Sequence, residues 1–341
     1  MQNKINIGII GKNFGYHVIY KSFLKNKKYN IKGFSFKSKK IEKIKIPKKI
    51  KIYPNWKKLI LDKKIDAVAI AAPPILHKKM IEFSIKNNKH IFCEKPFTCS
   101  YEEASLICNL VKRKKKIIHM VNYEFANIGA FQFFKQKVIN DIKINEINLD
   151  WFINMKRRAN TIWKENRLKG GGILFNYICH SIYYLESMFG EIASVKTSIF
   201  EEKKTKIKNL KGNIFFINGL IAKLNIQVGL IENKIAPTHK LKIITDKNDY
   251  ILETNLNSLS DKFNLAVLSK NMDRSKKILF SEKKNNNDFR VSPTLINSKK
   301  FSESILKSRV QSPNFFDAKR VHLIIKKILT SSKTNKKINI K

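Results

Sequence analysis

Short apolar runs alternate with helix-like segments over the first third of the chain. The runs are rich in β-branched and small side chains, which is typical of buried strands. The strand-like runs are residues 4–10, 30–36, 66–72, 91–92 and 116–122. The helix-like segments are residues 16–25, 75–87 and 100–112, with a further short helix ending over 59–62. Strands that alternate with helices predict strand–helix–strand crossovers and therefore a parallel sheet.

The pattern changes at about residue 123. A helix-like segment over 131–139 is followed by runs in which apolar and polar residues alternate. These runs are residues 144–152, 193–200, 213–217, 221–229, 240–246 and 250–255. Strands in series with one apolar face predict an open, mostly antiparallel sheet. A polar loop over 282–288, a helix over 313–329 and a short strand over 337–340 complete the expected elements.

With 341 residues, the chain is long enough for two domains. We expect an α/β Rossmann domain with a doubly wound parallel sheet over residues 1–122. An α+β domain for substrate binding and oligomerisation is expected over 123–341, with the option that the helix over 313–329 packs back on the first domain.

No apolar run reaches about 18 residues and no apolar signal segment opens the chain, so no membrane helix is expected. Four cysteines without zinc-ligand spacing predict reduced thiols, a cytoplasmic protein and no metal.

The net charge of +43 raises the question of a nucleic-acid partner. Only eight of the 69 basic residues are arginine, and the lysines are spread over the whole length. Arginine is the residue suited to phosphate forks and guanine edges. The charge therefore favours a solvated lysine surface that attracts small anionic substrates over specific nucleic-acid binding.

A glycine turn follows the first predicted strand. Gly11, Asn13, Phe14 and Gly15 lie between this strand and a helix, which is the context that a dinucleotide fingerprint needs. Glycines let a backbone approach a pyrophosphate, and the helix N-terminus supplies N–H donors. Asn13 replaces the second glycine of the fingerprint, and we expect asparagine to preserve the turn because it tolerates positive φ. Taken alone, the turn is equally compatible with an ordinary strand-to-helix connection.

The end of the second predicted strand bears on the cofactor. NAD-binding folds place an acidic residue there for the ribose hydroxyl, but the first acidic residue of this chain is Glu42. Ser35, Lys37 and Ser38 are found instead, and hydroxyls and cations suit a 2′-phosphate. NADP is therefore favoured, with NAD as the alternative.

Glu94, Lys95 and Pro96 follow the strand-like run at 91–92. Parallel sheets bind ligands beyond the carboxyl ends of their strands, so a carboxylate and an ammonium are expected at the ligand edge. Ala72 and Pro73 end the preceding strand and are expected near the nicotinamide ribose. His77, in the following helix, is expected to have a structural role and at most to touch the cofactor.

The second domain offers a third motif. Gly170, Gly171 and Gly172 open a helix-like segment in which Asn176 and His180 are four residues apart and share a face. A buried histidine more often completes a core than a site, but the glycine triplet and Asn176 favour a functional role for His180.

These motifs together resemble the family of glucose-fructose oxidoreductase, inositol 2-dehydrogenase and the rhizopine-catabolism proteins (Gfo/Idh/MocA). The resemblance implies NAD(P)-dependent hydride transfer at a hydroxyl-bearing carbon of a sugar, cyclitol or nucleotide sugar. It also implies a homodimer or homotetramer. Carried over to this chain, Lys95 lies near the nicotinamide and the substrate hydroxyl, His180 exchanges the proton, and Trp163 lies near the cofactor. Glu94 helps to place Lys95, and Asn176 holds a neighbouring hydroxyl.

Three departures from the family pattern keep a rival function open, and the first is Asn13 in place of a fingerprint glycine. Asn176 stands where the family has aspartate, and an amide cannot take a proton. Ala126 stands where many members have arginine. These changes fit either a divergent enzyme or a non-catalytic homologue that binds a dinucleotide or sugar for regulation.

Overall fold

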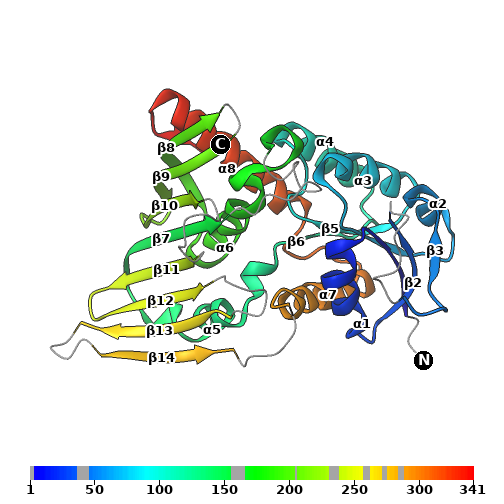
Figure 1. Cartoon of the computed structure of the whole chain (residues 1–341), viewed down its shortest axis with the longest axis horizontal. Coiled ribbons are helices and arrows are strands. Elements are labelled where there is room, and N and C mark those ends of the chain that lie inside the picture. The colour runs from blue at the N-terminus through cyan, green and yellow to red at the C-terminus, as the bar shows by residue number, and fades with distance from the viewer. Residues whose placement is uncertain are drawn as a thin grey trace. The chain divides into compact units, whose positions relative to one another are not determined.

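A computed structural model describes residues 4–36, 46–154, 166–203, 206–229, 238–255, 262–270, 275–282 and 288–341. The chain folds into two compact units (Figure 1). The first unit consists of residues 1–124 and 290–322, and the second of residues 125–289 and 323–341. Residues 290–322 thus return to the unit that contains the N-terminal strands.

The first unit is built on a six-stranded sheet in which every pairing is parallel. Its strands, in spatial order, are β3 (Lys51–Tyr53), β2 (Tyr29–Ser35), β1 (Ile5–Ile10), β4 (Ala67–Ile70), β5 (His90–Glu94) and β6 (His119–Asn122). This order is that of a doubly wound Rossmann sheet, so the predicted fold class is confirmed. Strand β3 is the one member that the sequence pattern did not indicate.

Helices connect these strands. They are the π-helical turn η1 (Gly15–Tyr20) with α1 (Lys21–Leu24), α2 (Trp56–Leu61), the 3-10 turn η2 (Pro74–Leu76) with α3 (His77–Lys86), and α4 (Tyr101–Arg113). Side chains cap the start of α4: the Ser100 side chain accepts from the Glu103 N–H at 3.2 Å, and the Glu103 carboxylate accepts from the Cys99 N–H at 3.0 Å.

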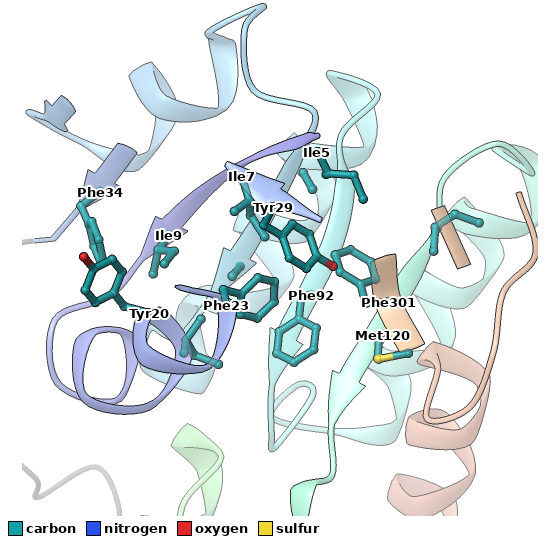
Figure 2. Packing of buried hydrophobic residues seen from close by; sticks show 14 of the residues in the cluster. Ile5, Ile7, Ile9, Tyr20, Phe23, Tyr29, Phe34, Phe92, Met120 and Phe301 are labelled. Carbon is teal, nitrogen blue, oxygen red and sulfur yellow. The ribbon is translucent and has the colours of Figure 1, made fainter. Parts of the chain in front are cut away.

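The core of the first unit packs apolar side chains of the sheet against η1, α1 and a late helix, α7 (Val291–Leu306) (Figure 2). The Phe92 ring lies 5.1 Å from Phe23 and 5.6 Å from Phe301, measured between ring centroids. All three side chains are fully buried. A residue nearly 300 positions from the start of the chain therefore completes the N-terminal core.

The second unit is built on a nine-stranded sheet with the order β14-β13-β12-β11-β7-β10-β9-β8-β15 (Figure 1). Its strands are β7 (Ile144–Asn154), β8 (Ile192–Lys203), β9 (Lys206–Phe216), β10 (Ile221–Gly229), β11 (Thr238–Thr245), β12 (Asn248–Asn255), β13 (Asn264–Ser269), β14 (Lys276–Ser281) and β15 (Ile338–Asn339). All pairings are antiparallel except that of β7 with β10. The predicted open, mostly antiparallel sheet is confirmed, although β13, β14 and the first half of β9 were not expected.

The described residues of the second unit also form helical segments. They are α5 (Gly129–Lys137), the short 3-10 turns η4 (Ile139–Asp141) and η6 (Arg167–Lys169), the π-helical turn η7 (Leu174–Ile178) and α6 (Cys179–Phe189). The 3-10 turn η3 (Glu124–Asn127) and the helix α8 (Phe315–Thr334) each run from the first unit into the second. In the part of the chain that the structure describes, no helix has both the length and the apolar character needed to cross a bilayer.

Candidate functional site

The turn after β1 requires glycine at its first position. Gly11 has a φ of +129°, and a Cβ on it would lie 2.3 Å from the Ala71 carbonyl oxygen. Its N–H donates to the Ser35 carbonyl at 2.9 Å, and the Ala71 N–H donates to the Ile10 carbonyl at 2.7 Å. The turn is thus clamped between the ends of β2 and β4, at the carboxyl edge of the sheet.

The helix begins directly after this turn, with Asn13 and Phe14 in its first helical residues. Asn13 is exposed and is not one of the described non-glycine residues with positive φ. The expected use of positive φ at Asn13 is therefore wrong, because the helix starts early enough to place this residue in ordinary helical backbone. A Cβ on Gly15 would meet its neighbours at 3.5 Å or more, which is van der Waals contact.

Ser35 ends β2 and is buried, with 2% of its surface exposed. Its carbonyl holds Gly11, so its backbone braces the glycine turn. Lys37 and Ser38, expected to face a 2′-phosphate, lie outside the described residues, and so does Trp163.

His77 joins the ends of two strands. Its ring is fully buried, with Nε2 at 2.8 Å from the Ala72 carbonyl oxygen and Nδ1 at 3.0 Å from that of Pro96. Burial lowers the pKa of His77, and the hydrogen bonds to the carbonyls act in the opposite direction. The residue therefore braces Ala72 and the Lys95–Pro96 turn. Pro73, which follows Ala72, has an exposed side chain.

Glu94 ends β5 as a buried carboxyl group, and half-buried Lys95 follows it. The Glu94 Oε1 accepts from the Asn122 Nδ2 at 2.6 Å. Asn122 in turn lies 3.1 Å from the Thr294 Oγ1 and accepts from the Asn297 Nδ2 at 2.9 Å. Side chains of β6 and α7 thus fix the carboxyl group next to Lys95.

Burial raises the pKa of Glu94 well above its usual range, and the neighbouring Glu124 carboxylate raises it further. The hydrogen bond from Asn122 and the positive charges of Lys95 and Arg290 lower it. Burial, the first of these causes, outweighs the hydrogen bond and the two positive charges, so the pKa of Glu94 stays above its usual range.

In the second unit, the predicted glycine triplet precedes the helix as expected. Gly170 and Gly172 have φ values of +73° and +75°, and the following residues form the π-helical turn η7 before α6 starts at Cys179. The wider turn of η7 alters the expected one-face relation of Asn176 and His180, because its hydrogen bonds span five residues. Asn176 is half-buried, whereas His180 is 2% exposed.

His180 contacts an aromatic cluster of the second unit through Phe125. Its ring stacks on Phe125 at 4.3 Å with an interplanar angle of 19°. One helical turn on, the Tyr184 hydroxyl group lies 3.0 Å from the His239 Nε2. Trp151 packs edge-on against His239 at 4.6 Å. Stacking on Phe125 thus links the imidazole of His180 to the cluster around His239.

Four residues of the first-unit site were not found by sequence reasoning: Asn122, Arg290, Thr294 and Asn297. Asn122 ends the last strand of the parallel sheet, and a polar residue at a strand end was a usable signal. The other three come from α7 and the residue before it, a segment for which no element was expected.

The residues at the carboxyl edge of the six-stranded sheet fit a dinucleotide. Gly11 forms a tight turn with positive φ at this edge, the helix after it starts with N–H groups that have no partner within the helix, and Lys95 follows β5 at the same edge. The fold and these features define a dinucleotide-binding protein with a second, open-sheet unit.

The chain belongs to the Gfo/Idh/MocA oxidoreductase family. Residues 5–123 match the family's NAD-binding Rossmann fold, and residues 135–339 match its C-terminal alpha/beta domain.

The chain matches three curated relatives over about two fifths of their length. An uncharacterized oxidoreductase of Synechocystis is 30% identical over 43% of this chain and 40% of its own. The 2,7-anhydro-N-acetylneuraminate hydratase of Escherichia coli is 30% identical over 41% of this chain and 38% of its own. The levoglucosan dehydrogenase of Pseudarthrobacter phenanthrenivorans is 29% identical over 41% of this chain and 37% of its own.

Among solved structures, a levoglucosan dehydrogenase in complex with NADH and levoglucosan superimposes with a TM-score of 0.80. The match covers 99% of this chain and 100% of that one at 17% sequence identity. At this identity the likeness establishes the shared fold of the whole chain.

Proposed function

We propose that the protein is an NAD(P)-dependent oxidoreductase that transfers a hydride to or from a hydroxyl-bearing carbon of a sugar, cyclitol or nucleotide sugar. The observation that carries the proposal is the shared position of the Gly11 turn and Lys95. They follow β1 and β5, whose carboxyl ends lie at one edge of the six-stranded sheet. Ligands of doubly wound sheets bind at that edge. The names of matched relatives, which include a levoglucosan dehydrogenase, support the sugar class of substrate.

The cofactor would be held by residues of the first unit. We assign its pyrophosphate to the turn from Gly11 to Gly15, and its nicotinamide side to Ala72, Pro73 and Lys95. NADP remains our preferred cofactor because the sequence after β2 supplies lysines and serines and no carboxylate. NAD is the alternative.

The chain's own part in the reaction is to manage a proton and a developing charge. Oxidation of a carbinol removes a hydride, which a bound nicotinamide accepts, and a proton, which the protein must take. We assign hydrogen bonding of the substrate oxygen to Lys95, which stabilises alkoxide charge. His180 takes or returns the proton, since imidazole titrates near neutral pH. Asn176 donates a hydrogen bond to a neighbouring hydroxyl.

The test is turnover by the purified full chain with NADPH or NADH and a panel of keto-sugars, followed by loss of reduced-nicotinamide absorbance. Lys95→Ala and His180→Ala should each lower kcat more than tenfold, which is about 1.4 kcal/mol of transition-state stabilisation. Lys86→Ala removes an exposed lysine of α3 and serves as the control. A smaller loss in either variant would remove that residue from the chemistry.

The alternative is a non-catalytic homologue that binds a dinucleotide or sugar to regulate a partner. The observation in its favour is Asn176, an amide at the position where the family has a proton-accepting aspartate. Two results together would establish this regulatory function. The wild-type chain would bind NADPH without turning over any substrate of the panel, and the Asn176→Asp variant would gain turnover.

A further inference from the structure

Arg290 stands out among the basic residues of the first unit. It is one of only eight arginines in the chain. It lies next to α7, far in sequence from the glycine turn, yet its guanidinium carbon is 5.0 Å from the centroid of the Phe14 ring. Phe14 belongs to the glycine turn itself. The positive charge of Arg290 also lowers the pKa of Glu94. One cation therefore lies near both the glycine turn and the Glu94–Lys95 segment.

Two contacts fix the backbone that carries Arg290. The Ser22 hydroxyl donates to the Val291 carbonyl at 2.9 Å, which ties the start of α7 to the helix after the glycine turn. Thr294, whose N–H donates to the Arg290 carbonyl at 3.1 Å, lies 3.1 Å from Asn122 at the end of β6. The start of α7 is thus anchored to elements that follow β1 and to β6, so the position of Arg290 is set by the fold of the first unit.

We propose that Arg290 is a cofactor-binding residue whose guanidinium contacts the pyrophosphate held at the turn from Gly11 to Gly15; this rests on the proposed function. The Arg290 guanidinium lies beside Phe14 of the segment from Gly11 to Gly15. A guanidinium carries five N–H donors in a fork that matches phosphate oxygens. Asn13 replaces a glycine that would let the backbone approach the pyrophosphate, and a guanidinium supplies an attraction that does not depend on that approach.

The rival role for Arg290 is to offset the buried Glu94 carboxyl group. The two roles differ when Glu94 is neutral. If Arg290 acts only on Glu94, its loss becomes harmless in a Glu94→Gln background. If it contacts phosphate, the loss of cofactor affinity is the same in both backgrounds.

The experiment measures dissociation constants for NADH and NADPH from the fluorescence of the reduced nicotinamide, without any turnover. Arg290→Met should weaken both ligands by about tenfold to a hundredfold, the range for a hydrogen bond to a charged group. Arg290→Lys should fall between wild type and Arg290→Met, because it keeps the charge and loses the fork. Arg309→Met removes the same charge at an exposed position beyond the far end of α7 and should bind like wild type.

The outcomes separate this inference from the proposed function. Absence of NADH and NADPH binding in the wild type overturns both. Normal binding in wild type with equal binding in Arg290→Met overturns the arginine contact alone. A loss confined to NADPH would move the contact to the 2′-phosphate and overturn the pyrophosphate assignment, as would rescue by Glu94→Gln. If Arg290→Met does not fold, the Arg290→Lys variant in both backgrounds gives the same decision.

Discussion

Two glycines of one turn have different physical reasons to be glycine. Gly11 has a backbone conformation that side chains rarely adopt, and a Cβ there would overlap the Ala71 carbonyl group. Gly15 has neither constraint, because a Cβ would only make van der Waals contact with Ile9 and Ala71. The fold therefore requires glycine at position 11. If glycine is also required at position 15, the reason would be contact with a ligand.

The first prediction separates these reasons. Gly11→Ala should lower the free energy of unfolding by about 1–3 kcal/mol, the cost of a strained backbone conformation. Gly15→Ala should leave it unchanged or raise it by about 0.4–1 kcal/mol through the unfolded state. Under our proposal, Gly15→Ala should nevertheless weaken NADPH binding, because Gly15 belongs to the turn that we assign to the pyrophosphate. Urea unfolding and nicotinamide fluorescence measure the two effects, and equal stability of the two variants would contradict the argument.

Residue motifs that directly follow a strand could be placed from the sequence. Glu94 and Lys95 follow an apolar run, and a parallel strand delivers whatever follows it to the ligand edge. Asn122 and Arg290 could not be linked to them, since their proximity arises from a pairing across the sheet and from a chain segment almost 200 residues away. The position of His180 in a helix was predictable, but its stacking on Phe125 was not, because ring contacts depend on tertiary packing.

At the level of elements, α7 shows why a buried helix can escape a hydrophobic pattern. Its buried residues include Thr294, Asn297, Ser298, Ser302 and Ser304 as well as apolar side chains. These hydroxyl groups are satisfied locally, as when Ser302 donates to the Lys299 carbonyl at 2.8 Å. Asn26 of the first unit also donates to Ser302, at 3.3 Å. A face that packs through hydroxyls carries no apolar periodicity, so only the structure shows it to be a core helix.

The second prediction concerns the amide that links α7 to the sheet. Asn122→Ala removes the partner of Glu94 and of Asn297 and leaves buried polar groups unsatisfied, at about 1–3 kcal/mol for each. We expect the free energy of unfolding to fall by at least about 2 kcal/mol. Asn225→Ala is the control, because Asn225 donates to Asp150 at 2.9 Å on an exposed strand face and its loss should change stability by less than about 0.5 kcal/mol. Equal urea midpoints for the two variants would contradict a structural role for the buried network.

At the level of the whole molecule, buried histidines set how the protein responds to acid. Burial lowers the pKa of His119 to about 4 and the pKa of His239 and of His322 to about 3. The pKa of His77 is lowered for the same reason. These histidines lie in both units, so we expect acid to lower the stability of each unit. Glu94 acts with the opposite sign, because a raised carboxyl pKa gives stability that is lost as the pH rises.

The third prediction follows from the direction of these shifts. In the unfolded chain a histidine titrates near pH 6.5, so below that pH the unfolded state binds protons that the folded state does not. The stability contributed by each neutral histidine is therefore complete above about pH 6.5 and is lost as the pH falls toward the folded pKa. At about pH 5.5 the loss is roughly 1.4 kcal/mol for each of His119, His239 and His322. Urea unfolding at neutral and mildly acidic pH measures the total.

Single variants assign this loss to particular side chains. His322→Gln should reduce the fall in unfolding free energy between about pH 7.5 and pH 5.5 by roughly 1.4 kcal/mol, whatever its effect on stability at neutral pH. His17→Gln is the control and should leave the fall unchanged, because the His17 side chain is exposed. The free energy of unfolding could fall equally between these pH values in wild type and in His322→Gln. This result would mean that the buried imidazole takes up its proton in the folded state. The argument from burial would then fail for His322, since a charged imidazole in that position would need an acceptor that stabilises it as well as water does.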